Sequence, residues 1–171
     1  MPVASVDPRL SDEKLRVIAR PGETSFVLQR TFHAPARLVY LAMSTPELVA
    51  RWWGPRGTTL VTCEMDFRVG GAWRFVLHGP GGTDVGFRGE YQEIVPGERI
   101  VQTFIYDPYP TAVAVETMRL EERDGRTTLT TKVQHASVEN RDGHLSSGME
   151  QGAGETMDRL AEVVGELAYK S

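Results

Sequence analysis

The stretch that decides the fold is NRDGHLSSGMEQGAGETMDRLAEVVGELAYK, residues 140–170. Apolar residues recur in it every three or four positions, which is the period of one face of an α-helix. They are Leu145, Met149, Ala153, Met157, Leu160, Val164 and Leu167. The charged residues fall on the other face, which we expect to point to water: Glu150, Glu155, Asp158, Arg159, Glu162, Glu166 and Lys170. The sequence therefore predicts one long amphipathic helix that lies against everything before it.

Three glycines fall in the first turns of this predicted helix. Gly148, Gly152 and Gly154 would each cost about 0.5–1 kcal/mol relative to alanine in a helix interior. Ser147 and Glu150 have the spacing of a capping box, which predicts a helix start at this point. The glycines indicate that something beside the first half of the helix needs room.

Upstream of the helix, alternating β-branched and aromatic residues between turn signals predict a sheet. An expected strand over residues 25–32 has a short hairpin partner near residues 15–19. Six more strands are predicted at Thr59–Phe67, Ala72–His78, Val85–Ile94, Arg99–Tyr106, Ala112–Glu121 and Thr127–His135. Their connections are too short for crossover helices, so the sheet must be antiparallel. Gly86 and Gly89 are the expected bend points.

Two short helices are predicted between the strand at residues 25–32 and the rest of the sheet. Pro35 and Pro46 each suit a first helical turn, and Gly54 ends the second helix after Trp53. The expected fold class is α+β, a curved antiparallel sheet wrapped around a long C-terminal helix. Residues 25–171 form one domain in this interpretation. Residues 1–24 form an N-terminal arm, of which residues 1–13 are loosely held and the remainder adds a strand.

Length, charge and cysteine content narrow the class of protein. A chain of 171 residues with 40% hydrophobic and 25% charged residues suits one globular domain. A net charge of −4 with scattered basic residues argues against a nucleic-acid partner. The single cysteine, Cys63, excludes an internal disulfide and suits a reducing compartment. No apolar run approaches the roughly 20 residues of a membrane span, so we expect a cytoplasmic protein with no membrane partner.

Several local motifs accompany this order of elements. They are Ala34-Pro35, Pro46-Glu47-Leu48, residues 51–55 (RWWGP), residues 66–75 (DFRVGGAWRF), residues 89–94 (GEYQEI), residues 98–101 (ERIV), residues 127–130 (TTLT) and Gly148-Met149. With them, residues 25–168 resemble the START-like SRPBCC superfamily. Within it the chain is similar to the activator of heat-shock-protein-ninety ATPase homologue family in its bacterial stand-alone form. The resemblance implies the helix-grip fold.

The chain departs from this family at one point. Members often carry a large aromatic residue, commonly Trp, shortly after the Gly-Met pair, where this chain has Gly152-Ala153-Gly154. The missing ring would leave a void between helix and sheet, and such a void either collapses or accepts a ligand.

Aromatic residues on one face of the predicted sheet would line this void, with three helix residues closing it. The expected ligand-binding residues are Trp53, Trp73, Phe75, Phe87, Tyr91, Phe104, Tyr106, His135, Met149, Ala153 and Met157. A filled core is the alternative, and a one-residue change in strand phase would exchange the two faces. Trp52 and Trp53 are either core anchors or a lid, and adjacent helical residues cannot both face the same way.

Catalytic and metal chemistry have little support in the sequence. The four histidines lack a metal-ligand spacing, so we expect no metal and no cofactor. His135 is the best acid–base candidate, but the sequence offers it no orienting partner. No nucleophile elbow, zinc-protease motif or phosphate-binding loop occurs. We therefore lean against an enzyme and predict no catalytic residues.

Three functions stay open. The first is a cytoplasmic protein that binds a small, largely apolar molecule between sheet and helix. The second is a cyclase-like or hydrolytic enzyme in the same cavity, with His135, Tyr91 or Tyr106 as proton donor. The third is a co-chaperone-like interaction module with a chaperone as partner. A homodimer is compatible with all three.

Overall fold

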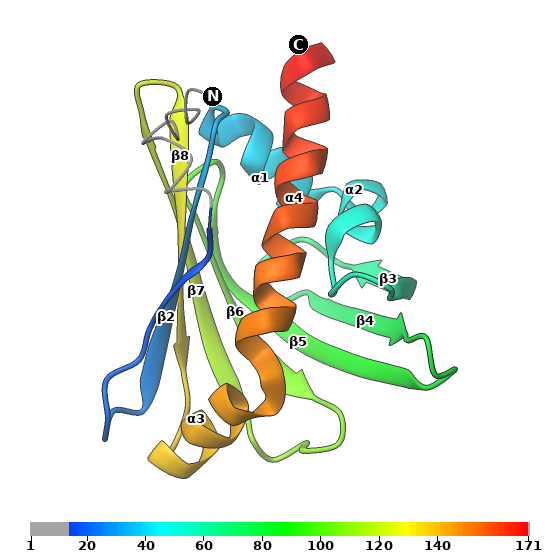
Figure 1. Ribbon diagram of the computed structural model, residues 1–171, viewed down its shortest axis with the longest axis vertical. Helices are drawn as coiled ribbons and strands as arrows, with labels where there is room; N and C mark the ends of the chain where they lie inside the picture. The colour runs from blue at the N-terminus through cyan, green and yellow to red at the C-terminus, as the bar shows by residue number, and fades with distance from the viewer. Residues whose placement is uncertain (1–13, 171) are drawn as a thin grey trace, which may run out of the picture.

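An eight-stranded antiparallel sheet curves around helix α4 (Glu150–Lys170) in the computed structural model, which describes residues 14–170 (Figure 1). The strands are β1 (Arg16–Ile18), β2 (Ser25–Phe32), β3 (Thr59–Met65), β4 (Ala72–His78), β5 (Asp84–Val95), β6 (Arg99–Tyr106), β7 (Ala114–Arg123) and β8 (Arg126–Gln134). Their order across the sheet is β1-β2-β8-β7-β6-β5-β4-β3. The predicted sheet is confirmed, and β1 supplies the added strand. The loosely held arm predicted for residues 1–13 lies outside the described residues.

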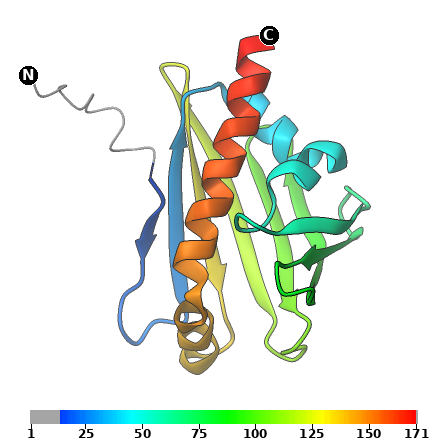
Figure 2. The ribbon, with the colours of Figure 1, turned by 45° about the vertical axis from the view of Figure 1, so that its right-hand side comes forward.

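Two short helices, α1 (Ala36–Ser44) and α2 (Pro46–Trp52), follow β2 as the sequence predicts. Helix α2 begins at Pro46. Its C-cap residue is Trp53, whose backbone amide donates a hydrogen bond to the carbonyl oxygen of Val49. Figure 2 shows α1 and α2 beside the C-terminal half of α4. None of the helices in residues 14–170 is both long and apolar enough to cross a membrane.

The sheet bends at β5, where two glycines allow other groups to approach the main chain closely. A Cβ atom on Gly89 would lie 1.9 Å from the carbonyl oxygen of Thr103 and 2.5 Å from the indole nitrogen of Trp73. The pairing of β5 with β6 also shifts register between Tyr91 and Glu93. As a result, β3 and β4 cross the direction of β2 and β8 (Figure 1). Gly86 and Gly89 are thus at the expected bend.

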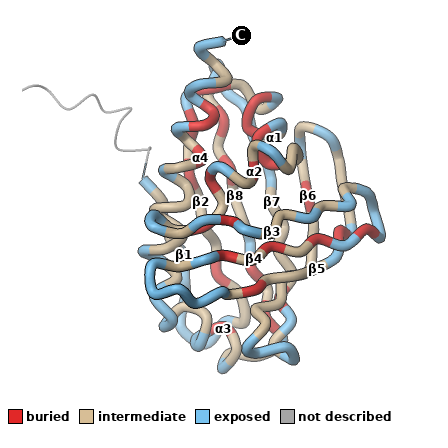
Figure 3. Tube along the Cα trace, turned by 90° about the vertical axis from the view of Figure 1, so that its right-hand side faces the viewer, coloured by how far each residue is buried: buried red, intermediate tan, exposed pale blue. Residues whose placement is uncertain are grey.

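The main core lies under the second half of α4. Leu160, Val163 and Val164 are buried there in one cluster with Val39 of α1 and Trp52 of α2. The Trp52 indole nitrogen donates to the carbonyl oxygen of Ala42 at 3.0 Å, which satisfies its polar atom inside the core. The buried stretches of α1, α4 and β4 stand out in Figure 3.

Five of the seven charged residues assigned to the outer face of α4 are exposed as predicted, whereas Glu155 and Arg159 are half-buried. Arg159 donates hydrogen bonds to the carbonyl oxygens of Gly54 (2.8 Å) and Arg51 (3.1 Å), which caps the C-terminal end of α2. Ion pairs join Arg56 to Glu162 and Arg51 to Glu166. Periodicity shows which residues share a face, but it could not show that the end of α2 covers Arg159.

The predicted single helix is also wrong in its first third. The chain forms α3 (Val138–His144), a π-helical turn η2 (Leu145–Met149) and then α4, and the backbone of Gly148 has φ 82° within the turn. The start is capped by Ser137, which accepts a hydrogen bond from the Asn140 amide at 3.0 Å. Ser147, the predicted cap, donates to the carbonyl oxygen of His144 instead.

The break has a packing reason. Leu145 and Met149 pack on a second apolar cluster, formed by Phe26, Ala114 and Val133, at the lower end of the sheet. A left-handed residue lets the chain turn toward this cluster and then enter α4 at another angle.

Two glycine substitutions test this account of the break. Gly148→Ala places a side chain in left-handed backbone and should lower the free energy of unfolding by about 1–2 kcal/mol. Gly152→Ala is the matched control, because it lies in regular helix and its added Cβ meets no atom within 4 Å. That variant should gain about 0.5–1 kcal/mol. Urea denaturation measures both, and a stabilising Gly148→Ala would contradict the account.

Candidate functional site

A cavity of about 970 Å³ lies between the inner face of the sheet and the broken start of the C-terminal helix. Its walls come from β2, β4, β5, β6, β7 and β8 on one side and from α3, η2 and the first turns of α4 on the other. Small residues create the space on the helix side. Cβ atoms built on Gly148 and Gly152 meet nothing within 4 Å, and both residues line the cavity beside Ala153.

Most of the predicted ligand-binding residues come together around this cavity. Trp53, Phe87, Phe104, Tyr106, His135, Met149, Ala153 and Met157 all line it. The Trp53 ring meets the edges or faces of Phe75 and Phe87 with centroids 4.9 and 5.0 Å apart. Trp52, by contrast, faces the core, so the two adjacent tryptophans have different surroundings. As ligand contacts, the eight residues stay predictions.

Trp73, Phe75 and Tyr91 do not line the cavity. They are buried in the main core, with exposed fractions of 2%, 5% and 2%. Trp73 packs beneath the backbone of Gly89, Phe75 lies between the rings of Trp53 and Trp73, and Tyr91 meets Phe67. The bend in β5 turns this end of the sheet toward α1 and α2, which cover it, and the sequence pattern did not reveal that cover.

The sequence interpretation also missed polar residues on the cavity wall. Glu116 on β7, His144 at the end of α3 and Arg30 on β2 all line it. A signal for Glu116 was present, because it alternates with Ala114, Met118 and Leu120 on a face that is otherwise apolar. A carboxylate on a buried apolar face is rare unless a partner group pairs with it.

Glu116 lies in the middle of the sheet, opposite Gln102 on β6 and Val133 on β8. The Gln102 amide nitrogen donates to its Oε1 at 3.0 Å, and no other hydrogen bond or ion pair reaches this carboxyl from residues 14–170. The side chain retains some accessible surface because it borders the cavity. Burial away from bulk water raises the pKa of Glu116 to about 7.

Two histidines form a neutral pair at the lower end of the cavity. His135 Nε2 and His144 Nδ1 share a hydrogen bond of 3.0 Å, so His135 does have an orienting partner, contrary to the sequence interpretation. The His144 ring stacks on Phe104 with centroids 5.8 Å apart. Desolvation and the neighbouring His135 lower the pKa of His144 to about 4, and desolvation also lowers the pKa of His135.

The arginines near the cavity are already engaged with acidic residues. Arg74 and Arg88 both bind Asp107, at 2.7 and 2.6 Å, and so hold the start of the β6–β7 loop, whose Tyr109 borders the cavity. Arg30 contacts Asp158 of α4 at 3.4 Å and lies over the Phe32 ring. Within residues 14–170, no group of three or more His, Cys, Asp or Glu side chains could hold a metal ion.

Comparison with known proteins identifies the family. The profile described as Activator of Hsp90 ATPase homolog 1-like protein matches residues 33–165. The chain belongs to this family. The match begins just before α1 and ends within α4, so it spans most of the cavity wall as well as the main core. Among curated proteins, no match is found.

Solved structures of bacterial proteins share the helix-grip fold of this member of the family. A crystal structure from Rhodobacter sphaeroides has a TM-score of 0.82 and 26% identity, over 90% of this chain and 99% of that one. A solution structure from Arthrobacter aurescens has a TM-score of 0.79 and 25% identity, over 88% and 91%. The AHSA1 protein from Silicibacter pomeroyi, at 21% identity over 86% and 99%, has a TM-score of 0.68 and shows the fold alone. The predicted fold and family are confirmed.

The raised pKa of Glu116 predicts a pH-dependent stability. Because this pKa rises from 4.5 in the unfolded chain to about 7 in the folded protein, the folded state keeps a proton that the unfolded chain releases. The free energy of unfolding therefore decreases, through this group, as the pH rises from 4.5 to 7. Glu116→Gln removes this loss and should be more stable than the parent protein by about 2–3 kcal/mol at pH 8, and equally stable near pH 4.

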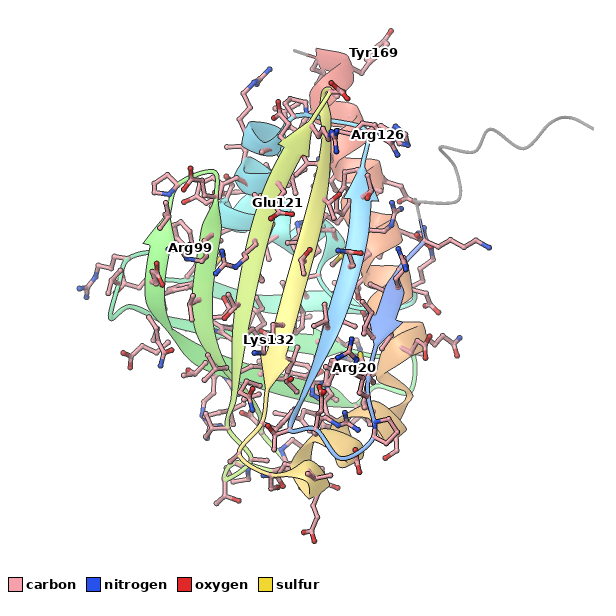
Figure 4. All side chains as sticks on the ribbon, turned by 90° about the vertical axis from the view of Figure 1, so that its left-hand side faces the viewer. Arg20, Arg99, Glu121, Arg126, Lys132 and Tyr169 are labelled. Carbon is pink, nitrogen blue, oxygen red and sulfur yellow. The ribbon has the colours of Figure 1, made fainter. Side chains whose placement is uncertain are left out.

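Urea denaturation at the two pH values measures this difference. Glu121→Gln is the matched control, because Glu121 is exposed on the outer face of the same strand (Figure 4). It should change the free energy of unfolding by less than about 0.5 kcal/mol at either pH. An equal stability of Glu116→Gln and parent protein at pH 8 would show that the carboxyl is not desolvated.

Proposed function

We propose that this protein binds a small, largely apolar molecule in the cavity between the sheet and the broken helix. The single observation that carries the proposal is the cavity itself, whose volume of about 970 Å³ suits a small organic molecule. Its walls are mainly aromatic and aliphatic, with a few polar groups at fixed positions. Pockets for small molecules have this composition.

The space is built into the sequence of the helix. Gly148 of η2 and Gly152 and Ala153 of α4 line the cavity together with aromatic residues of β5 and β6. A leucine or an aromatic residue there would fill the space and stabilise the core by burying apolar area. Gly152 also forgoes the helix propensity that alanine would supply. The unfilled space and the glycine at position 152 both lower the stability of the protein. Binding of a ligand in the cavity would explain why they are present.

A catalytic function is the second candidate, and one observation favours it. The cavity contains a carboxyl whose pKa is about 7 and a pair of histidines whose pKa values are lowered. Groups with shifted pKa values in a cavity are candidates for general acid–base chemistry. A cyclase-like or hydrolytic reaction would require product formation that Glu116→Gln or His135→Ala abolishes while ligand affinity is retained.

A co-chaperone-like role is the third reading, and it rests on the family alone. Capture of the chaperone by the purified protein, together with no effect of any apolar compound, would favour it over ligand binding. A homodimer and a cytoplasmic location stay predictions from the sequence.

A melting screen tests ligand binding without knowledge of the ligand. A compound present at about 100 times its Kd should add about 2.7 kcal/mol to the free energy of unfolding. Apolar metabolites of the size of the cavity should raise the melting temperature, whereas polar sugars and nucleotides should not. Absence of a shift with every apolar compound would count against the proposal.

A cavity-filling substitution tests where binding occurs. Ala153→Trp places an indole in the cavity, so stability should be unchanged or higher, and the affinity for the apolar dye N-phenyl-1-naphthylamine should fall at least tenfold. Dye fluorescence and urea denaturation measure the two effects. Tyr169→Trp is the control, because Tyr169 is 93% exposed at the far end of the same helix. A loss of several kcal/mol in Ala153→Trp from overpacking would exclude the cavity.

A further inference from the structure

We propose that the ligand is an apolar molecule with a basic nitrogen, and that Glu116 binds its ammonium group inside the cavity. This inference rests on the proposed function and specifies the chemistry of the ligand. It starts from one observation, a carboxyl on the cavity wall that forms no ion pair with any residue of the described chain.

Glu116 lines the cavity, and its two carboxyl oxygens differ in their hydrogen bonding. Oε1 accepts the hydrogen bond from Gln102, and Oε2 has no hydrogen-bond partner in residues 14–170. The cross-strand neighbour on the other side is Val133, which lines the cavity with Phe26. A carboxylate held in this way has one oxygen fixed and one available, which is the arrangement that receives a ligand donor.

The charge of an ionised Glu116 has no counterion within the described chain. Arg30 is engaged with Asp158, and Arg74 and Arg88 are engaged with Asp107, so the nearby arginines are neutralised elsewhere. The two histidines are neutral at physiological pH because their pKa values are lowered. A buried charge without a partner is strongly unfavourable, and a ligand cation would remove that penalty.

The other walls of the cavity also favour a cation over an anion. The faces of aromatic rings attract positive charge, and six Phe, Trp or Tyr side chains line the cavity: Phe26, Trp53, Phe87, Phe104, Tyr106 and Tyr109. An anionic ligand would meet the carboxyl and these ring faces with no free arginine to bind it. A neutral ligand would donate a hydrogen bond to the carboxyl or accept one from its protonated form without balancing its charge, and this alternative gives a different result in the experiment below.

Three fluorescent probes with the same apolar body separate these possibilities. They are 1-pyrenemethylamine, 1-pyrenemethanol and 1-pyreneacetic acid, titrated at pH 8, where the amine is mainly protonated. The parent protein should bind the amine at least tenfold more tightly than the alcohol, and the acid most weakly. Glu116→Gln should bind the amine and the alcohol with affinities equal within about twofold.

Glu121→Gln serves as the charge-matched control, because it removes one carboxylate from the outer face of β7 and leaves the cavity unchanged (Figure 4). This variant should keep the full preference for the amine. If the preference in the parent protein came from net charge rather than from Glu116, both variants would lose the same part of it, and the inference would be overturned.

The remaining outcomes are also decisive. Equal binding of the amine and the alcohol by the parent protein, or tighter binding of the alcohol, would overturn the ammonium inference and leave the apolar cavity intact. Binding of none of the three probes would count against the proposed function itself. Because the three probes are compared on the parent protein first, this test does not depend on the folding of any variant.

Discussion

Arg159 donates hydrogen bonds to the main-chain carbonyls at the end of α2, and this contact divides helix α4 into two parts. On its C-terminal side, Leu160 and Val164 are buried between the sheet and the short helices, and ion pairs from Arg51 and Arg56 hold the helix in place. On its N-terminal side, the helix presents glycine and alanine to the sheet, and the cavity begins. Because the contacts of its C-terminal part hold α4 in place, its N-terminal part can border an unfilled space without a change in the position of the helix.

The chemistry of the cavity follows from where the sheet places its few polar residues. Apolar walls raise the pKa of Glu116 to about 7 and lower that of His144 to about 4, so near pH 7 the imidazole is neutral and the carboxyl is divided between its two forms. The histidines share one hydrogen bond, while the buried Nδ1 of His135 and one oxygen of Glu116 have no hydrogen-bond partner in residues 14–170. Of these groups only Glu116 carries a charge when it is ionised, so it is the group with which a ligand cation would interact most favourably.

The sequence predicted the strands well because alternation and turn residues are local properties. It missed the break at Gly148, since helical periodicity continues through residues 145–149 while a single left-handed residue redirects the chain. It placed Trp73, Phe75 and Tyr91 on the cavity because alternation identifies the inner face of a strand but not which part α1 and α2 cover. The pairing of His135 with His144 depends on that same redirection, so no spacing rule could have found it.

The central claim is that a ligand enters between the sheet and the first turns of α4, and methionine methyl groups report on this directly. Met149 and Met157 line the cavity, whereas Met43 lies in the main core and Met65 is on the edge strand β3. In methyl-labelled protein titrated with 1-pyrenemethanol, the ring current of the probe should shift the NMR signals of Met149 and Met157 and leave those of Met43 and Met65 in place. Saturable binding that leaves the signals of Met149 and Met157 unchanged would contradict the account.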